Sequence, residues 1–266
     1  MKKVLFTDLD GTLLDLRSYS YSKSESSLKS LKDQGVPVVF CSSKSRAEQE
    51  YYRQILEVND PFIVENGSAI FIPKGYFKKE VPFNTYVTDD YEVIQLGESV
   101  TNIRQTIKEL REDLLLDFVC YFDIPPEEVS LYTSLNLNEA KRAMKREFSE
   151  SILRGAINEK FLRRLKRRGL ISIPGSKFNT VISKQADKGK AIEILQSLYK
   201  NESQDLFTFG VGDSGNDLEM FKVVDDPYIV QRPSGEWYDL KDDTVKKASG
   251  VGPEGWNKVV EIILNA

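Results

Sequence analysis

Short apolar runs, separated by amphipathic stretches, dominate the first third of the chain. These runs have the length of buried strands and predict strands at residues 4–7, 36–41, 62–64 and 69–72. Leucines at helical spacing before a glycine predict a helix over residues 24–34, and a second helix is expected over residues 45–56. An Asn-Gly pair at residues 66–67 predicts a tight hairpin turn.

From about residue 81 the chain is more charged and its apolar positions are less regular. Helices are predicted there at 99–113, 139–148 and 159–168, and strands at 170–173 and 178–182. The first pattern then resumes, with helices predicted at 188–199, 217–223 and 255–264, a buried strand at 206–211 and an edge strand at 228–230.

Strands that alternate with helices indicate a parallel sheet. We therefore predict an α/β fold with a Rossmann-like parallel-sheet core and an inserted α+β domain. The core is expected to comprise residues 1–82 and 186–266, and the inserted domain residues 83–185.

Composition narrows the possible functions. The 266 residues include no histidine, which excludes serine–histidine and cysteine–histidine catalysis, histidine-based phosphatases and histidine-ligated metals. The formal charge of −4 argues against nucleic acid or anionic membrane as a partner. The two cysteines are too few for a disulfide scaffold, and neither has a partner at metal-ligand spacing that would suggest a zinc site. The first apolar run is too short for a signal peptide or membrane span, so we expect a soluble, cytoplasmic protein.

Polar residues follow three of the predicted strands. Asp8 and Asp10 follow the first, Ser42 the second and Asp213 the strand at 206–211, and ligands of parallel sheets bind beyond such strand ends. Asp8, Asp213 and the carbonyl of Asp10 offer the oxygen ligands that Mg²⁺ prefers. A carboxylate can also attack phosphorus, Ser42 can donate to a phosphoryl oxygen, and Lys188 adds a positive charge at a helix start.

Each of these features also has a purely structural interpretation. The Asp-x-Asp-Gly segment could be only a turn, Ser42 a helix cap, Lys188 a solvated helix lysine and residues 212–217 an ordinary loop. Their shared placement at strand ends and helix starts favours one site.

Four segments then carry a family resemblance. They are Phe-Thr-Asp-Leu-Asp-Gly-Thr-Leu at 6–13, Val-Val-Phe-Cys-Ser-Ser at 38–43, Lys-Gly at 188–189 and Gly-Val-Gly-Asp-Ser-Gly-Asn-Asp at 210–217. In these motifs and their order the chain resembles the haloacid dehalogenase superfamily. The second aspartate, two residues after the first, resembles the phosphatase branch, and the large insert resembles a type C2 cap domain.

Further segments resemble the mannosyl-3-phosphoglycerate phosphatase family; they are residues 42–53, 61–73, 187–191 and 252–256. Ser45 stands where that family is expected to carry threonine, and it keeps the hydroxyl. The resemblance is weakest from about residue 83 to 171. It implies a Mg²⁺-dependent phosphoric monoester hydrolase that acts on a small phosphorylated sugar–glycerate and releases mannosylglycerate, a compatible solute, and phosphate.

The resemblance also implies residue roles. Asp8 is the expected nucleophile, and Asp10 the acid that protonates the leaving oxygen and then activates water. The expected metal ligands are Asp8, Asp10 and Asp213. The expected phosphate contacts are Ser42, Ser43 and Lys188. Asn216 and Asp217 are expected to support the site, and Asp217 would orient Lys188.

Substrate contacts are expected on both domains. In the cap we expect Gly175, Ser176 and Lys177; in the core we expect Glu65 and Asn66 at sugar hydroxyls, with Lys44 and Arg46 as anion contacts. The basic runs at 141–142, 145–146 and 163–168 are expected to be solvated helix faces. A hinged cap would close over the substrate before the chemistry.

Two neighbouring functions stay open at this point. One is a phosphatase for glucosyl-3-phosphoglycerate, sucrose phosphate or a broad range of hexose phosphates. The other is a phosphotransferase similar to phosphomannomutase, which would return the phosphoryl group to a sugar instead of to water. A non-catalytic sugar-phosphate sensor is disfavoured, because a sensor needs neither a nucleophile nor an acid.

Overall fold

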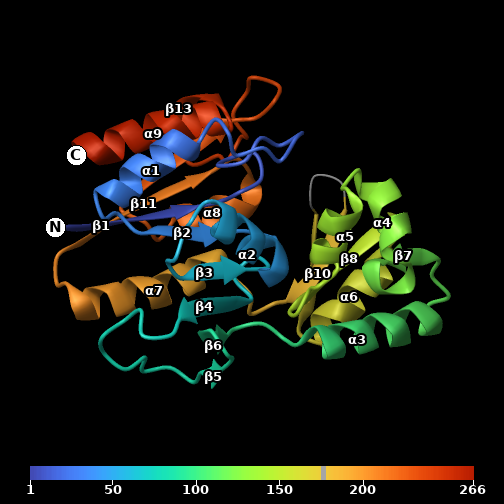
Figure 1. Ribbon diagram of the computed structural model, residues 1–266. Coiled ribbons are helices and arrows are strands. Elements are labelled where there is room, and N and C mark those ends of the chain that lie inside the picture. Colours follow the sequence, from blue (N-terminus) through green and yellow to red (C-terminus); the bar gives the residue numbers. More distant parts are fainter. Residues whose placement is uncertain (175–177) are drawn as a thin grey trace.

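The computed structural model describes residues 1–174 and 178–266, which form two lobes with one sheet in each (Figure 1). The larger sheet has the order β13-β12-β11-β1-β2-β3-β4-β6-β5. Strands from β13 to β3 are parallel to their neighbours, and β4, β6 and β5 join antiparallel. These strands are β1 (Lys2–Thr7), β2 (Val38–Cys41), β3 (Phe62–Val64), β4 (Ala69–Pro73), β5 (Tyr86–Val87), β6 (Tyr91–Gln95), β11 (Leu206–Gly212), β12 (Asp226–Gln231) and β13 (Lys246–Val251).

Helices cover both faces of this sheet, which explains why its central strands are continuously apolar. Leu5 and Phe40 pack into a cluster on one face, whereas Phe6 and Val39 pack into a cluster on the other. The first cluster is closed by α1 (Glu25–Asp33), α2 (Arg46–Ile55) and α9 (Pro253–Asn265), and the second by α7 (Lys188–Glu202) and α8 (Leu218–Phe221) (Figure 1).

The smaller lobe is a cap built on an antiparallel sheet of order β7-β8-β10-β9. Helices α3 and α6 pack on one face of this sheet, and α4 and α5 pack on the other. No helix in the described ranges is both long and apolar enough to cross a membrane. The cap elements are β7 (Phe118–Cys120), β8 (Ser149–Gly155), β9 (Leu170–Pro174), β10 (Asn179–Ser183), α3 (Val100–Asp113), α4 (Pro126–Thr133), α5 (Leu137–Ala143) and α6 (Glu159–Arg167); short 3₁₀ turns lie at η1 (Tyr121–Asp123) and η2 (Gly215–Asp217).

The first boundary of the cap lies later in the chain than expected. β5 and β6 extend the large sheet beyond residue 82, because Val93 and Ile94 alternate into the two core clusters. Gly97 still donates its N–H to the Ser68 carbonyl at 2.7 Å in the core. We therefore propose that the cap begins after Gly97 and ends near Lys184, in place of residues 83–185.

Two predicted elements differ from the structure. The helix expected over 139–148 ends at Ala143, and β8 begins at Ser149, because a core carboxylate receives the backbone N–H groups of Glu147 and Phe148. The strand at 228–230 is not an edge strand, since β13 pairs beyond it. β13 is largely polar and solvent-exposed, so its sequence carries little apolar pattern.

The hairpin turn between β3 and β4 packs closely against the start of α7. Gly67 lies in this turn with φ of +90°, and a Cβ at this position would collide with the backbone carbonyl of Asp187. Only glycine tolerates both constraints at once. The turn therefore fixes the approach of α7, and with it the position of Lys188.

We expect Gly67→Ala to lower the free energy of unfolding by about 2–4 kcal/mol, because it combines backbone strain with overpacking. Gly35→Ala is the matched control: Gly35 also has positive φ, at +68°, but no atom lies within 4 Å of its added Cβ. The control should lose only about 1 kcal/mol. Urea denaturation measures both, and equal losses would contradict the role given to the turn.

Candidate active site

Three loops meet at the carboxyl edge of the parallel sheet. β1 lies between β2 and β11, and Thr7 at its end is in register with residues of both neighbours. Asp8 therefore leaves the middle strand where Ser42 and Asp213 leave the strands on either side. This topology brings together residues that are more than 200 positions apart in the sequence.

The backbone at Asp8 is held from two sides. Its N–H donates to the Val211 carbonyl at 2.9 Å, and its carbonyl accepts the Thr7 hydroxyl at 2.8 Å. Thr7 in turn accepts a hydrogen bond from the indole N–H of buried Trp256 at 3.0 Å. The closing helix α9 thus braces the strand end that carries Asp8.

Lys188 bridges two of the buried carboxylates. It is the first residue of α7, where Asp187 caps the helix, and only 2% of its surface is exposed. Its Nζ lies 3.0 Å from Asp8 Oδ1 and 2.7 Å from Asp217 Oδ1. Burial acts to lower the pKa of Lys188, but Asp217 and Asp8 outweigh it and hold that pKa above its usual range. The side chain is therefore a fixed positive charge.

A cluster of three carboxylates surrounds this charge. One oxygen each of Asp8, Asp213 and Asp217 lies within 4.8 Å of the others, and all three residues are buried. Burial raises the pKa of Asp8 well above its usual range; Lys188 opposes this shift, and Asp217 and Asp213 add to it. Burial, followed by repulsion from Asp217, raises the pKa of Asp213 to about 7.

The donor set fits a divalent cation that prefers oxygen ligands. Asp217 is largely committed elsewhere, because its Oδ1 pairs with Lys188 and its Oδ2 accepts the N–H groups of Asp213 and Ser214 at 3.1 and 3.2 Å. Asp8 and Asp213 are thus the groups available to a metal, and a cation between them would relieve their mutual repulsion. Carboxylates without histidine or cysteine suit Mg²⁺.

Asn216 belongs to the same turn as Asp217. Its Oδ1 accepts the hydroxyl of Ser214 at 2.6 Å, which ties the turn together behind Asp213. The structure therefore places both residues that were expected to support the site next to one of the metal-binding candidates.

Asp10 is not a member of the three-carboxylate cluster, and its side chain pairs with Lys44. Its Oδ1 lies 3.0 Å from Lys44 Nζ, and Lys44 also lies 3.5 Å from Glu48 Oε1. The Lys44 ammonium stands over the rings of Tyr19 and Tyr52, at 4.8 and 5.7 Å from their centres. Burial raises the pKa of Asp10, and Lys44 opposes that shift.

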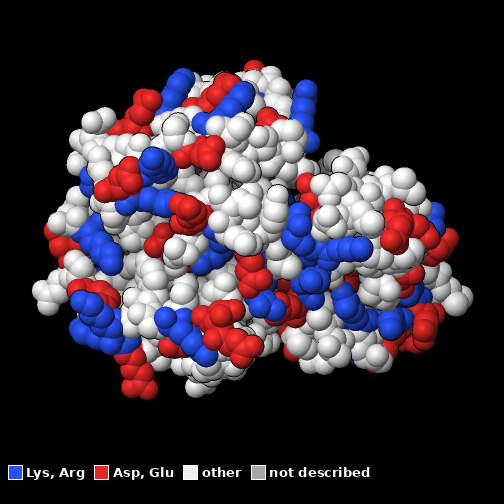
Figure 2. Space-filling view, in the orientation of Figure 1, with Lys and Arg blue, Asp and Glu red and all other residues white. Residues whose placement is uncertain are grey.

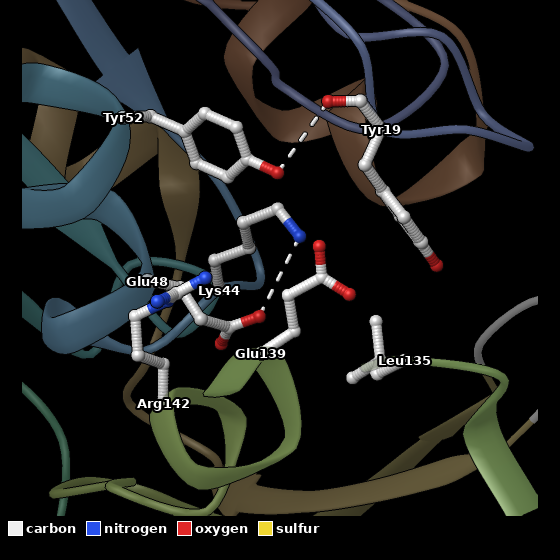
Figure 3. Close-up of a pocket in the computed structure, with 7 residues that line it drawn as sticks. All are labelled: Tyr19, Lys44, Glu48, Tyr52, Leu135, Glu139 and Arg142. Carbon is white, nitrogen blue, oxygen red and sulfur yellow. Dashed lines mark hydrogen bonds and ion pairs between the residues drawn. The ribbon is translucent and has the colours of Figure 1, made fainter. Parts of the chain in front are cut away.

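A small pocket opens beside this ion pair, between core and cap (Figure 3). The open space is about 10 Å³, room for about one water molecule. This space is too small to hold a sugar. The lining residues are Tyr19, Lys44, Glu48 and Tyr52 from the core and Leu135, Glu139 and Arg142 from the cap.

Ser42 and Ser43 follow the end of β2 and lead to Lys44. Ser42 is 1% exposed; its carbonyl accepts the Asn66 N–H at 3.0 Å, and its Oγ accepts the Lys44 N–H at 3.4 Å. The hydroxyl hydrogen of Ser42 is left to donate. The Ser43 carbonyl accepts a hydrogen bond from Arg146 of the cap at 2.9 Å.

Glu65 does not face a ligand, which corrects its expected role at sugar hydroxyls. It is fully buried, and its carboxylate accepts the N–H groups of Glu147 and Phe148 at 2.8 and 3.1 Å and the hydroxyl of Ser149. Arg146 approaches it at 3.6 Å. Both carboxylate oxygens are therefore committed to the cap.

Residues 142–149 form a docking segment through which the cap contacts the core. Besides the bonds to Glu65, the Ser45 hydroxyl donates to the Arg142 carbonyl at 2.9 Å, and Arg46 pairs with Glu147 at 2.7 Å. Figure 2 shows Lys and Arg side chains gathered along the boundary between the two lobes. Cap position is thus tied directly to the loop that carries Ser42 and Ser43.

Several other expectations have mixed outcomes. Arg146 is 8% exposed, so it is not part of a solvated helix face. Arg46 pairs with the carboxylate of Glu147, so a group of the protein occupies the anion contact expected of it. Asn66 is buried, and its Oδ1 has no hydrogen-bond partner among the described residues. The expected cap contacts Gly175, Ser176 and Lys177 lie outside the described residues.

Sequence reasoning also missed functional candidates. Tyr19 and Glu139 belong to no motif, and Glu48 and Tyr52 lie in the segment 42–53 but were given no role there, because the pocket is lined by both core and cap residues. A local signal was that Glu48 follows Ser45 at capping-box spacing, and the structure contains that capping box.

Comparison with known proteins places this geometry in a family. Residues 5–237 match the haloacid dehalogenase-like hydrolases. The chain is 39% identical over 265 residues to a glucosyl-3-phosphoglycerate/mannosyl-3-phosphoglycerate phosphatase of Methanococcoides burtonii, with 98% of this chain and 96% of the relative covered. It is 41% identical over 230 residues to a mannosyl-3-phosphoglycerate phosphatase of Pyrococcus horikoshii, with 86% and 91% covered.

Solved structures support the fold. A crystal structure of a Thermoplasma acidophilum protein superposes with a TM-score of 0.68 at 17% identity and covers 98% of both chains. The mainly parallel core sheet with a separate four-stranded antiparallel cap sheet is the arrangement expected for a type C2 cap.

We expect Mg²⁺ to raise the melting temperature of the protein, because a ligand that binds only the folded state stabilises it. Asp213→Asn should remove most of that rise by deleting one of the two available carboxylates. Asp33→Asn, at an exposed position on α1, is the control and should keep the rise. Differential scanning calorimetry with and without Mg²⁺ measures this, and an undiminished rise in the Asp213 variant would contradict the assignment.

Replacing Glu65 should loosen the docking segment locally. Glu65→Gln substitutes an amide N–H₂ for one acceptor oxygen, so we expect amide exchange at Glu147 and Phe148 to be at least about tenfold faster. Glu57→Gln alters an exposed carboxylate and should leave those rates unchanged. Hydrogen exchange with mass spectrometry reads both, and unchanged rates in the Glu65 variant would refute the docking role.

Proposed function

Because this chain belongs to the haloacid dehalogenase-like hydrolases, we propose that it is a Mg²⁺-dependent phosphatase that hydrolyses mannosyl-3-phosphoglycerate to mannosylglycerate and phosphate. The observation that carries the proposal is the buried contact of Lys188 with Asp8, beside Asp213. This contact aims a cation and a carboxylate at the same strand edge, which suits attack on an anionic phosphoryl group.

Asp8, Asp213 and the carbonyl of Asp10 are the proposed ligands of the metal. When bound, Mg²⁺ supplies positive charge that offsets the repulsion between a carboxylate and a phosphate. Lys188 contributes a second positive charge at Asp8, and Asp217 keeps that charge in place. Ser42 donates its hydroxyl hydrogen to a phosphoryl oxygen, and Ser43 completes the phosphate-binding loop.

Phosphoryl transfer begins at Asp8. Its carboxylate oxygen forms a bond to phosphorus as the bond from phosphorus to the glycerate oxygen breaks. Protonated Asp10 gives its proton to that departing oxygen and becomes a carboxylate. Lys44, 3.0 Å from Asp10, stabilises the charge that remains there.

The second step regenerates the enzyme. Asp10 takes a proton from a water molecule as the water oxygen bonds to phosphorus, and the bond between phosphorus and the Asp8 oxygen breaks. Free phosphate leaves, Asp8 returns as a carboxylate and Asp10 is protonated again. A phosphotransferase would deliver the phosphoryl group to a sugar instead, so release of free phosphate separates the two functions.

The choice of substrate follows from the relatives. Both curated relatives described above include mannosyl-3-phosphoglycerate in their names, and one also includes glucosyl-3-phosphoglycerate. At about 40% identity the second compound is the main competing substrate. The small pocket beside the Asp10–Lys44 ion pair, called the Lys44 pocket from here on, is lined by core and cap residues. It is the proposed site of the sugar–glycerate group.

Parallel phosphate-release assays test this proposal. We expect mannosyl-3-phosphoglycerate to have a higher kcat/KM than glucosyl-3-phosphoglycerate, and sucrose phosphate and hexose phosphates to be poor substrates. A hexose phosphate that is hydrolysed more efficiently than either glycerate ester would overturn the proposed substrate class, although the phosphatase mechanism would stand.

Substitution of the nucleophile tests the mechanism. Asp8→Asn should lower kcat by at least about a thousandfold, because the amide cannot form the covalent intermediate. Asp33→Asn should leave kcat unchanged. Turnover by the Asp8 variant at a comparable rate would mean that water attacks the substrate directly.

A further inference from the structure

The cap contributes one cation to the pocket beside Asp10. Arg142, in the last turn of α5, lines this pocket together with Lys44 (Figure 3). Its guanidinium lies over the ring of Tyr51, 3.9 Å from the ring centre. Within the described residues, no carboxylate lies within ion-pair distance of Arg142. A charged group at a domain boundary without a charged partner is a candidate for binding an anion.

The backbone fixes Arg142 at this place. Its carbonyl accepts the hydroxyl of Ser45, the residue that caps α2, at 2.9 Å. The other end of α5 is closed by a capping box between Asn136 and Glu139. The short helix is thus held at both ends. Arg142 contacts the core at Ser45, two residues after Ser43.

The other charged groups of the pocket are already engaged or are not cationic. Lys44 is shared between Asp10 and Glu48, at 3.0 and 3.5 Å. Glu48 also accepts the N–H of Ser45 at 2.9 Å, and Glu139 accepts the Asn136 N–H at 2.8 Å. Arg142 is therefore the pocket cation with the most capacity for a new anion.

The chemistry of the proposed substrate calls for such a group. The leaving oxygen of a 3-phosphoglycerate ester is carried by C3, and only C2 separates this carbon from the carboxylate carbon. When Asp10 reaches the leaving oxygen, that carboxylate must lie near Asp10, on the side where the Lys44 pocket opens. A guanidinium can bind a carboxylate through two parallel hydrogen bonds, which gives directional selectivity as well as charge.

We propose that Arg142 is a specificity-determining residue that binds the glycerate carboxylate of the substrate. The enzyme would thereby select phosphomonoesters whose leaving group carries a carboxylate close to the bond that breaks. The sugar would lie beyond, where Glu139 and the pocket tyrosines offer hydrogen-bond acceptors and donors. This inference rests on the proposed function, since it names how that same site chooses its substrate.

The test compares one substrate with and without its negative charge. The full chain is assayed with Mg²⁺ on mannosyl-3-phosphoglycerate and on the same compound with its carboxylate converted to a carboxamide. We expect Arg142→Gln to lower kcat/KM for the acid by roughly 10- to 100-fold, mainly through a higher KM, because a charge-assisted pair is lost. The value for the carboxamide should change less than about twofold.

Two further variants separate recognition from structure. Arg142→Lys keeps the charge without the two-pronged geometry and should lie between wild type and the glutamine variant. Lys141→Gln removes an exposed cation from the same helix and should leave both substrates unaffected. Melting temperatures equal to wild type establish that each variant is folded.

The possible failures are distinct. If Arg142→Gln lowers kcat/KM equally for acid and carboxamide, Arg142 only holds the cap in place and the inference is wrong, while the proposed function stands. If the wild-type protein does not hydrolyse mannosyl-3-phosphoglycerate, the proposed function and this inference both fall.

Discussion

The rest of the structure depends on the ion pairs that the ammonium group of Lys188 forms with buried carboxylates. A buried cation is tolerated only beside opposite charges, and Asp8 and Asp217 provide them at 3.0 and 2.7 Å. The same contacts order three separate chain segments at one edge of the sheet. Gly67 admits the start of α7 to this edge, and Trp256 braces the strand end through Thr7. Removing the lysine would leave two buried carboxylates without their counter-charge.

A second constraint joins the cap to this centre. The carboxylate of Glu65 belongs to the core, yet its hydrogen-bond partners are backbone groups of the docking segment. Arg146 extends the contact to the carbonyl of Ser43. A displacement of the cap would therefore act directly on the loop that carries Ser42 and Ser43, which we propose binds phosphate. This arrangement suits a reaction in which water must be excluded before the covalent step and readmitted after it.

Local sequence patterns predicted the core well, because its strands are apolar on both faces and its site residues follow strand ends. Asp8, Lys188 and Asp217 could be grouped in advance because they share one strand edge and one helix start. The exposed strand β13 was not predicted, because it is largely polar. The helix that corresponds to α5 was predicted to end too late, because its basic run has helical spacing. The burial of Arg146 and the pairing of Glu65 depend on contacts 80 or more residues apart in sequence. No local pattern records such contacts.

The central claim is that the phosphoryl group passes through Asp8. It is tested most directly by trapping the intermediate in an Asp10→Asn variant, which cannot activate water, with a phosphate ester whose leaving group needs no proton. Acid quenching followed by peptide mass spectrometry should find the phosphoryl group on Asp8, accompanied by a burst of leaving group equal to the enzyme concentration. Release of the leaving group without a burst, and without a phosphorylated peptide containing Asp8, would contradict the account.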